Sequence, residues 1–209
     1  ITANLISAES DEQVWSQRWD RQLDDIFEVQ DEVSQAIVAL LGSAVTGQEQ
    51  KRLVQRKKTT NLSAWDLYLK ALSVQNNKGS GEQVIASCKA AIELDNQFCD
   101  AYVLWCRTLT GMIFSHEYAD SRAANESQFH INAQKAFDLD PNNPEAVIML
   151  SRSYNIKRDY DKRIELAKRA LDLNPHHPSC NMDYGLAISS FGRFDEALMH
   201  IFKAVEMDP

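Results

Sequence analysis

The sequence lacks the features that mark metal sites and disulfide frameworks. Its 209 residues include only four cysteines, and no two of them form a C-x-x-C pair. Structural zinc sites need ligands at close spacing, so the cysteines predict no such site. We interpret them as small buried apolar side chains in a reducing cytosol, with two of them, Cys88 and Cys106, on predicted packing faces.

Long apolar runs are also missing. The longest, such as Ala36–Leu41, fall far short of the length that spans a bilayer, and no signal peptide is visible. We therefore expect a cytoplasmic chain without a membrane span. Because the chain starts at Ile1 rather than methionine and stops at Pro209, we expect it to be a piece of a longer protein.

No constellation of catalytic residues is present. The sequence contains no Ser-His-Asp or Cys-His arrangement, and Gly79-Ser80-Gly81 has no Lys-Ser/Thr pair at the spacing of a phosphate-binding loop. We interpret His176-His177 and His200 as solvated polar residues rather than metal ligands. The sequence thus predicts no catalytic, cofactor-binding or metal site, and no enzyme activity for this segment.

Positive charge is outnumbered. The chain has 22 Lys and Arg against 30 Asp and Glu, a net charge of -8, which argues against a general nucleic-acid surface. A basic stretch at Lys51–Lys58 is the exception. We interpret it as a solvated helix between two domains, with contact to nucleic acid or anionic lipid as the less favoured alternative.

One phrase recurs in the C-terminal half. It reads Phe137–Pro141, then Leu171–Pro175, then Val205–Pro209, and the closing prolines are 34 residues apart. Five residues before each proline stands a small residue, where two helices of a pair approach closely: Ala136, Ala170 and Ala204. This period and spacing resemble the tetratricopeptide repeat family, whose repeats are pairs of short helices.

The last two repeats carry the pattern most fully. Tyr184-Gly185 and Ile188 fit the first helix of the last repeat, and Gly192 is expected to end that helix. In the repeat before it, Ser151 takes the small position of the first helix. Arg163 departs from the pattern, because it stands where a small residue should open the second helix.

Two looser repeats lie upstream. Asn96 replaces proline in the closing phrase of the first one, and the interval from Asn96 to Pro141, which closes the second, is 45 residues, 11 more than the period. We expect this surplus as a loop between paired helices, around Phe114–Ser121. The repeats are predicted at about 62–96, 97–141, 142–175 and 176–209. They indicate a mainly α protein, a right-handed α-solenoid of tetratricopeptide helix pairs.

The first sixty residues have a different pattern. Ile1–Ser7 and Val14–Trp19 alternate around a polar loop and predict a β-hairpin, and an apolar stripe from Ile26 to Leu41 predicts a helix. We place the domain boundary between residues 1–58 and 59–209.

The stretch Val14–Val33 resembles the end of the TolB amino-terminal-like α/β domain, so residues 1–58 would be the C-terminal part of such a domain with a linker helix. This resemblance implies a bacterial chain that begins with a class III adenylate or guanylate cyclase domain, or with a winged-helix domain. Any catalytic or DNA-reading residue would then precede Ile1.

Amide and arginine side chains are expected on the concave side of the first helices, by helical spacing from the packing residues. Such groups suit the carboxylates or backbone of a bound peptide. Asp66 and Lys70 replace the lysine and asparagine of the clamp in chaperone-binding repeats, so that clamp is not expected. The candidate partner-binding residues are Asn76, Asn77, Arg107, Arg152 and Asn155.

These observations predict a non-catalytic interaction or regulatory module of a larger bacterial signalling protein, with a nucleotide cyclase as the favoured parent. Its partner would be a protein or peptide segment in the concave groove. The alternatives are the sensor arm of a winged-helix transcription regulator, or a structural module that homodimerises through the N-terminal hairpin, whose strand edges and tryptophans invite pairing.

Overall fold

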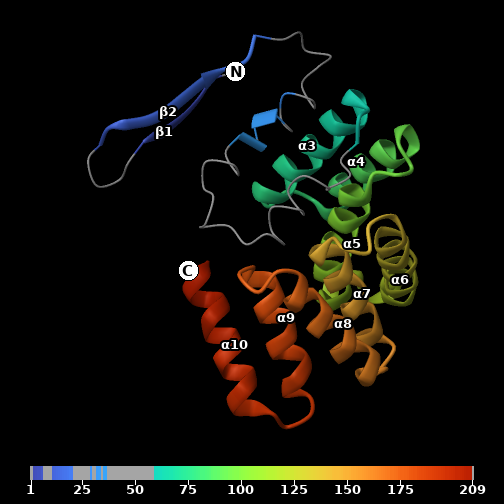
Figure 1. The fold of residues 1–209 in the computed structure, drawn as a ribbon. Helices are drawn as coiled ribbons and strands as arrows, with labels where there is room; N and C mark the ends of the chain where they lie inside the picture. Colours follow the sequence, from blue (N-terminus) through green and yellow to red (C-terminus); the bar gives the residue numbers. More distant parts are fainter. Residues whose placement is uncertain are drawn as a thin grey trace. The chain divides into compact units, whose positions relative to one another are not determined.

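The computed structural model of the chain describes residues 2–6, 11–20, 29, 32–33, 35–36 and 59–208. Its contacts divide the chain into two compact units, Ile1–Gln55 and Arg56–Pro209. The fold is mainly helical with a short antiparallel strand pair near the N-terminus, as the sequence predicts (Figure 1). The predicted basic stretch at Lys51–Lys58 and most of the predicted helix from Ile26 to Leu41 lie outside the described residues.

The strand pair is the predicted hairpin. Strand β1 (Thr2–Ile6) pairs antiparallel with β2 (Gln13–Arg18), with an irregular register between Leu5 and Ile6. The Ser16 hydroxyl donates to Asn4 Oδ1 across the pair at 2.7 Å. Within the same unit, the Trp15 and Trp19 rings lie 6.1 Å apart at a tilt of 56°.

Between Leu62 and Met207 the structure describes every residue, and this stretch forms successive helix pairs (Figure 1). The first helices of the pairs are α3 (Leu62–Asn76), α5 (Cys99–Phe114), α7 (Pro144–Ile156) and α9 (Pro178–Ser189). The second helices are α4 (Gly81–Leu94), α6 (Arg122–Leu139), α8 (Tyr160–Leu173) and α10 (Phe194–Met207). Each helix packs on the next one along the chain, and α3, α5, α7 and α9 also contact one another in order. The first helices therefore form one continuous layer.

Polar caps fix where several of these helices begin. The Asn61 side chain accepts from the Ala64 amide, Asn143 from the Glu145 amide and Asp159 from the Lys162 amide, at 3.0, 3.0 and 3.1 Å. These bonds satisfy amides that have no partner inside the helix. Pro144 and Pro178 occupy first-turn positions, where proline loses no needed donor.

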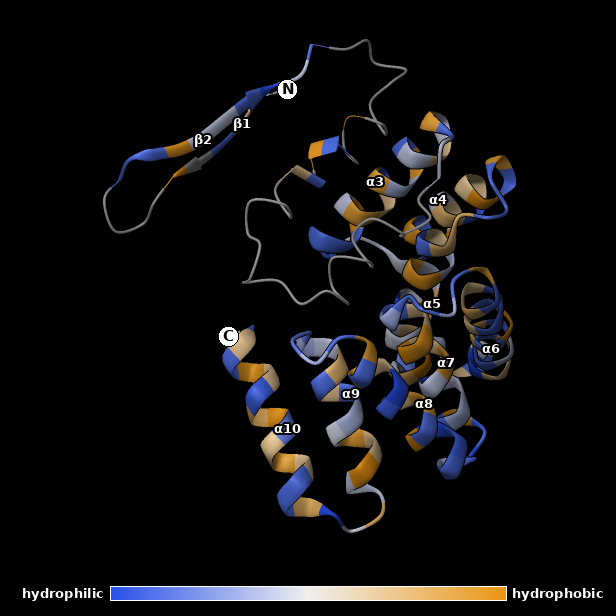
Figure 2. Ribbon diagram, in the orientation of Figure 1, coloured by the Kyte–Doolittle hydropathy of each residue, from blue (hydrophilic) through white to orange (hydrophobic). Residues whose placement is uncertain are grey.

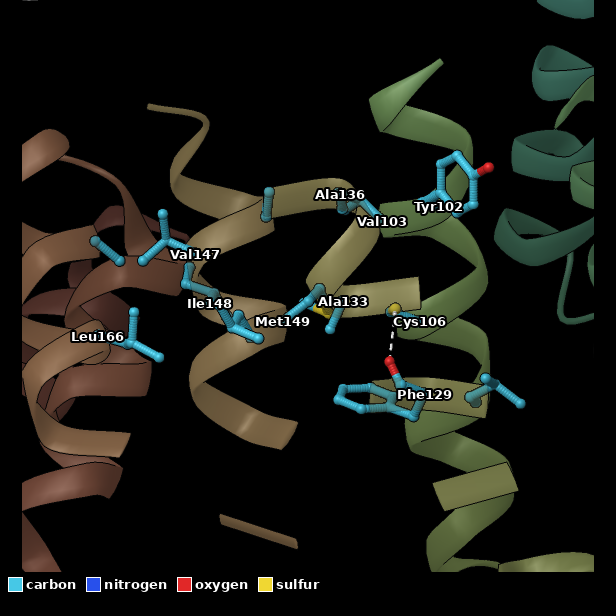
Figure 3. Close-up of a cluster of buried hydrophobic side chains, with 14 of the residues drawn as sticks. Tyr102, Val103, Cys106, Phe129, Ala133, Ala136, Val147, Ile148, Met149 and Leu166 are labelled. Atoms are coloured by element: carbon cyan, nitrogen blue, oxygen red, sulfur yellow. Dashed lines mark hydrogen bonds between the residues drawn. The ribbon is translucent and has the colours of Figure 1, made fainter. Parts of the chain in front are cut away.

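The core lies between the layers of the array. Figure 3 shows part of it, with Val103 and Cys106 from α5 facing Ala136, Ala133 and Phe129 from α6. The Cys106 thiol lies 3.6 Å from the Phe129 carbonyl oxygen, and the Cys99 thiol lies 3.4 Å from the Ala136 carbonyl oxygen. Burial raises the pKa of Cys106 and raises that of Cys88 to about 12, so both thiols stay protonated near neutral pH. The interpretation of Cys88 and Cys106 as buried packing residues is confirmed.

The close approach of paired helices is clearest at Gly185 on α9. A Cβ atom there would lie 2.9 Å from the Ala197 carbonyl oxygen and 2.9 Å from Ile201 Cγ1 on α10. Gly192, which was expected to end α9, instead lies two residues after the C-cap Ser190, in the loop between the two helices, where it takes a φ of +76°.

The surplus residues of the second repeat lie in a short 3-10 helix, η3 (His116–Ser121), and in α5 and α6 on either side of it, which are longer than α7 and α8. This is where the sequence predicts an insertion. The Glu82 carboxylate on α4 accepts from the Ser80 hydroxyl and from the Tyr118 phenol, which in that order lower the pKa of Glu82, and the bond to Glu82 raises the pKa of Tyr118 to about 12. The insertion therefore packs back on the first repeat.

Second helices also bond to the loop that closes the preceding repeat. On α8, Arg169 Nη2 donates to the Pro141 carbonyl at 2.8 Å. On α10, Lys203 Nζ donates to the Pro175 carbonyl at 3.2 Å. Arg169 and Lys203 are 34 residues apart, so the same contact recurs in successive repeats.

Candidate partner-binding face

The two predicted arginines occupy equivalent positions on neighbouring first helices. Arg107 on α5 and Arg152 on α7 are 45 residues apart, the same interval that separates the starts of these two helices. Their side chains are 46% and 30% exposed. Since α5 and α7 pack against each other, both arginines belong to the layer of first helices.

Arg107 is held by a carboxylate of the next repeat. Its Nη2 lies 3.0 Å from Glu145 Oε2, and the Glu145 side chain is 18% exposed. The other oxygen of Glu145 lies 3.6 Å from Nε2 of His177, which caps the start of α9. His177 Nδ1 accepts from the Ser179 amide at 3.2 Å, so the neutral ring carries its proton on Nε2, toward Glu145. Three successive repeats thus meet at Glu145.

Arg152 reaches a second, more buried carboxylate. Its Nε donates to Asp183 Oδ1 at 3.0 Å, and the Asp183 side chain is 1% exposed. Arg163 Nη2 on α8 approaches the same oxygen at 3.5 Å. The Ser151 hydroxyl lies 3.0 Å from both Asp183 Oδ2 and the Arg163 carbonyl. We call these four side chains, from α7, α8 and α9, the Asp183 network.

The Asp183 network explains the departure of Arg163 from the repeat pattern. A buried charge is tolerated only when it is paired and hydrogen-bonded. Arg163, itself buried, finds its countercharge in Asp183 on the next first helix, and Ser151 leaves room for the guanidinium. The arginine therefore replaces close packing of small residues by an ionic contact between repeats.

The three predicted asparagines are exposed. Asn155 lies one turn after Arg152 on α7, so these two share a face. Asn76 is the last residue of α3, and Asn77 is its C-cap. The Asn77 amide donates to the Ser73 carbonyl at 2.9 Å, so part of its hydrogen-bonding capacity serves the helix end.

The sequence interpretation missed the carboxylates that engage the arginines. Glu145 and Asp183 each stand on the first helix that follows their arginine. Asp183 had a signal: an arginine at a position meant for a small residue implies a countercharge nearby. Glu145 had no such signal, because acidic residues are common in the first turn of a helix, where the helix dipole stabilises their negative charge.

A serine–histidine pair lies between α6 and α7, and the sequence interpretation did not identify it. His130 Nδ1 is 3.0 Å from Ser153 Oγ. The Ser153 hydroxyl already donates to the Leu150 carbonyl at 2.7 Å, so His130 must be the donor of the pair. Ser153 is also buried, which leaves no access for a substrate. The pair is a packing contact, and desolvation, followed by the charge of Lys157, lowers the pKa of His130.

Within the part of the chain that the structure describes, no three His, Cys, Asp or Glu side chains cluster as metal ligands would. His200 Nδ1 instead lies 3.1 Å from Asn181 Oδ1. In the same described residues, no helix combines the length and apolar character needed to cross a bilayer.

The chain is similar to known proteins in two ways. Residues 144–177 match the family described as "Tetratricopeptide repeat". The chain is also 29% identical over 165 residues to "Putative adenylate cyclase 3" of Rhizobium meliloti (strain 1021), a match that covers 78% of this chain. The chain spans only 28% of the length of that curated relative.

Solved structures share its fold. A thermophilic TPR protein of Thermus thermophilus is 18% identical with a TM-score of 0.61, covering 86% of this chain and 92% of its own. The Arabidopsis OM64 TPR domain is 13% identical with a TM-score of 0.51, covering 62% of this chain and 97% of its own. At these identities the likeness concerns the fold alone. The helical unit therefore has the fold of these TPR proteins, and residues 144–177 within it match the tetratricopeptide repeat family.

Proposed function

We propose that the helical unit is a non-catalytic protein-interaction module that holds an acidic protein segment. The segment would lie on the face of the first helices that carries Arg107, Arg152 and Asn155, which we call the first-helix face. The tetratricopeptide fold supports an interaction role. The acidic character of the segment is inferred from the side chains on this face. The non-catalytic role is proposed because those side chains form no arrangement of reacting groups.

The exposure of Arg107 and Arg152 is the observation that carries this proposal. Both arginines are more exposed than the carboxylates that hold them, so the accessible charge here is positive in a chain of net charge -8. Each of the two ion pairs involves one guanidinium nitrogen, and the planar group has further N–H donors. Those donors match a partner's carboxylates, and Asn155 beside Arg152 can bond to the partner's backbone.

Charge reversal of Arg107 tests the proposal. The probes are a synthetic peptide rich in Asp and Glu and its Asn/Gln counterpart. The acidic peptide should bind more tightly, and Arg107→Glu should weaken its binding about tenfold, because one charge-assisted contact is lost. Arg122→Glu is the control, because Arg122 is an exposed arginine at the start of α6. Equal affinity of the Arg107→Glu variant and the unmodified chain, measured by calorimetry, would reject the proposed face.

We also propose that the parent protein is a bacterial class III adenylate or guanylate cyclase in which this segment regulates an upstream output domain. The support is the similarity to "Putative adenylate cyclase 3" of Rhizobium meliloti and the resemblance of Val14–Val33 to a TolB-like domain. Sequencing the coding region upstream of Ile1 tests it. A cyclase domain with its metal-binding aspartates is expected, and a winged-helix domain would instead make the segment a sensor arm.

A further inference from the structure

Helix α10 carries an exposed apolar surface that other second helices lack. Leu198, Met199 and Phe202 are 48%, 61% and 62% exposed, and their spacing places them on one face. We call these three residues the α10 patch. Phe194 and Val205 extend the apolar surface at its edge, and Figure 2 shows the hydrophobic colouring along α10.

The patch departs from the repeat at Phe202 in particular. Phe202 lies two residues before the small residue Ala204, and each other second helix has a counterpart at that offset. Those counterparts are polar: Lys89, Gln134 and Lys168. A large aromatic side chain at a position that is otherwise polar is therefore specific to α10.

Continuation of the repeat would not cover this surface. On α8, the counterparts of Leu198 and Val205 are Ile164 and Leu171, which are partly or fully buried in the core, where α8 packs on α9. The counterparts of Met199 and Phe202 are Glu165 and Lys168, and both remain exposed beside α9. A further helix placed as α9 is placed would cover the edge of the patch and leave its centre in water.

Acidic residues border the patch along the helix. Asp195 and Glu206 are exposed, and they stand one turn before and one turn after the apolar residues on the same face. A partner that covers the apolar centre would therefore meet negative charge at both ends.

We propose that the α10 patch docks an amphipathic helix of another protein whose apolar face is flanked by Lys or Arg. The apolar centre supplies a surface for large side chains, with Phe202 as the aromatic anchor and Met199 as an adaptable contact. The acidic borders select a basic helix and disfavour an acidic one. This site is separate from the first-helix face, which the proposed function assigns to an acidic segment.

A second copy of the chain fits the patch poorly. Antiparallel pairing of two α10 helices brings the acidic border of one copy against that of the other. Packing of the partner copy's α3 on α10 fails for another reason. The exposed face of α3 offers one large apolar side chain, Leu69 at 44% exposed, among Asp66, Lys70 and Ser73, so it gives the apolar centre only a small apolar counterpart.

Two synthetic amphipathic peptides of about 18 residues, or about five helical turns, test the proposal. They share one apolar face and differ only in flanking lysines or flanking glutamates. By fluorescence anisotropy with the full chain, the lysine peptide should bind at least about fivefold more tightly than the glutamate peptide, because the peptide charges that face the two acidic borders change sign. Phe202→Glu should abolish binding. Ile131→Glu, at the α6 counterpart of Met199 and 60% exposed, should leave binding unchanged.

Four results would overturn the proposal. They are binding of neither peptide, an equal loss of both peptides' binding in Phe202→Glu, binding of the lysine peptide that survives Phe202→Glu, and a dimer of the chain by light scattering that Phe202→Glu dissociates. Hydrogen exchange with and without the lysine peptide locates the binding site, because a peptide bound to the patch should protect the amides of α10. Loss of acidic-peptide binding in Arg107→Glu leaves the α10 result unaffected, so the two proposals fail independently.

Discussion

Asp183 is a fully buried carboxylate that holds two arginines and a serine from two neighbouring helices. Replacing a buried partner leaves the opposite charges without compensation, which costs far more than the loss of an exposed pair. The network therefore makes the contact between the third and fourth repeats depend on one side chain.

Substitution of Asp183 by Ala should lower the free energy of unfolding by about 3–5 kcal/mol, because Arg163 stays buried without a countercharge. Urea denaturation followed by circular dichroism measures this. Asp172→Ala is the matched control, since its exposed pair with Lys168 lies within one helix and contributes little. Similar losses for Asp183→Ala and Asp172→Ala would contradict the assigned role.

The lowered pKa values of two histidines predict how the stability of the fold depends on pH. Desolvation lowers the pKa of His130 and of His200 below the ordinary value of 6.5, so the unfolded chain binds protons more readily. Stability from these groups is therefore fully present above about pH 6.5 and is lost as pH falls through the window below it. Urea midpoints between pH 5 and 7.5 should fall with decreasing pH. They should fall less in the variant His130→Asn/His200→Asn, and an unchanged slope would argue against this cause.

Helices α9 and α10 approach each other so closely that the pair depends on Gly185. Gly185→Ala should cost about 1–3 kcal/mol, because the new methyl group meets a backbone carbonyl that cannot move aside. Gly111→Ala on α5 is the control, since a Cβ there has nothing within 4 Å. It should instead stabilise the helix by about 0.5–1 kcal/mol. Thermal unfolding of the two variants should therefore shift in opposite directions, and shifts of the same sign would contradict this account.

The helices were predictable because the repeat signal is local. The small residues, closing prolines and polar caps each act within one or two turns, so a single sequence discloses them. The insertion at His116–Ser121 was predictable from spacing alone. The Asp183 network was not, because Ser151 and Asp183 are 32 residues apart and their meeting depends on how α7 packs on α9. The α10 patch could not be predicted either. A phenylalanine such as Phe202 is usually buried, and only the packing of the neighbouring helices shows that this one is exposed.

At the scale of the whole molecule, the array should fold without the N-terminal unit. Each repeat contacts mainly its neighbours, and the core cluster lies within residues 71–197. A fragment of residues 59–209 should therefore be helical and unfold cooperatively at nearly the temperature of the full chain. An unfolded fragment would contradict the predicted boundary between residues 58 and 59, and circular dichroism decides between these outcomes.

The bonds from Arg169 to Pro141 and from Lys203 to Pro175 give the array a mechanical polarity. Each bond ties the second helix of one repeat to the loop that closes the repeat before it. Tension applied at the C-terminal end strains the bond from Lys203 first. The bond from Arg169 is strained only after α9 and α10 detach. Pulled from that end in optical tweezers, the array should yield in steps from the last repeat inward, with Lys203→Met lowering the force of the first step.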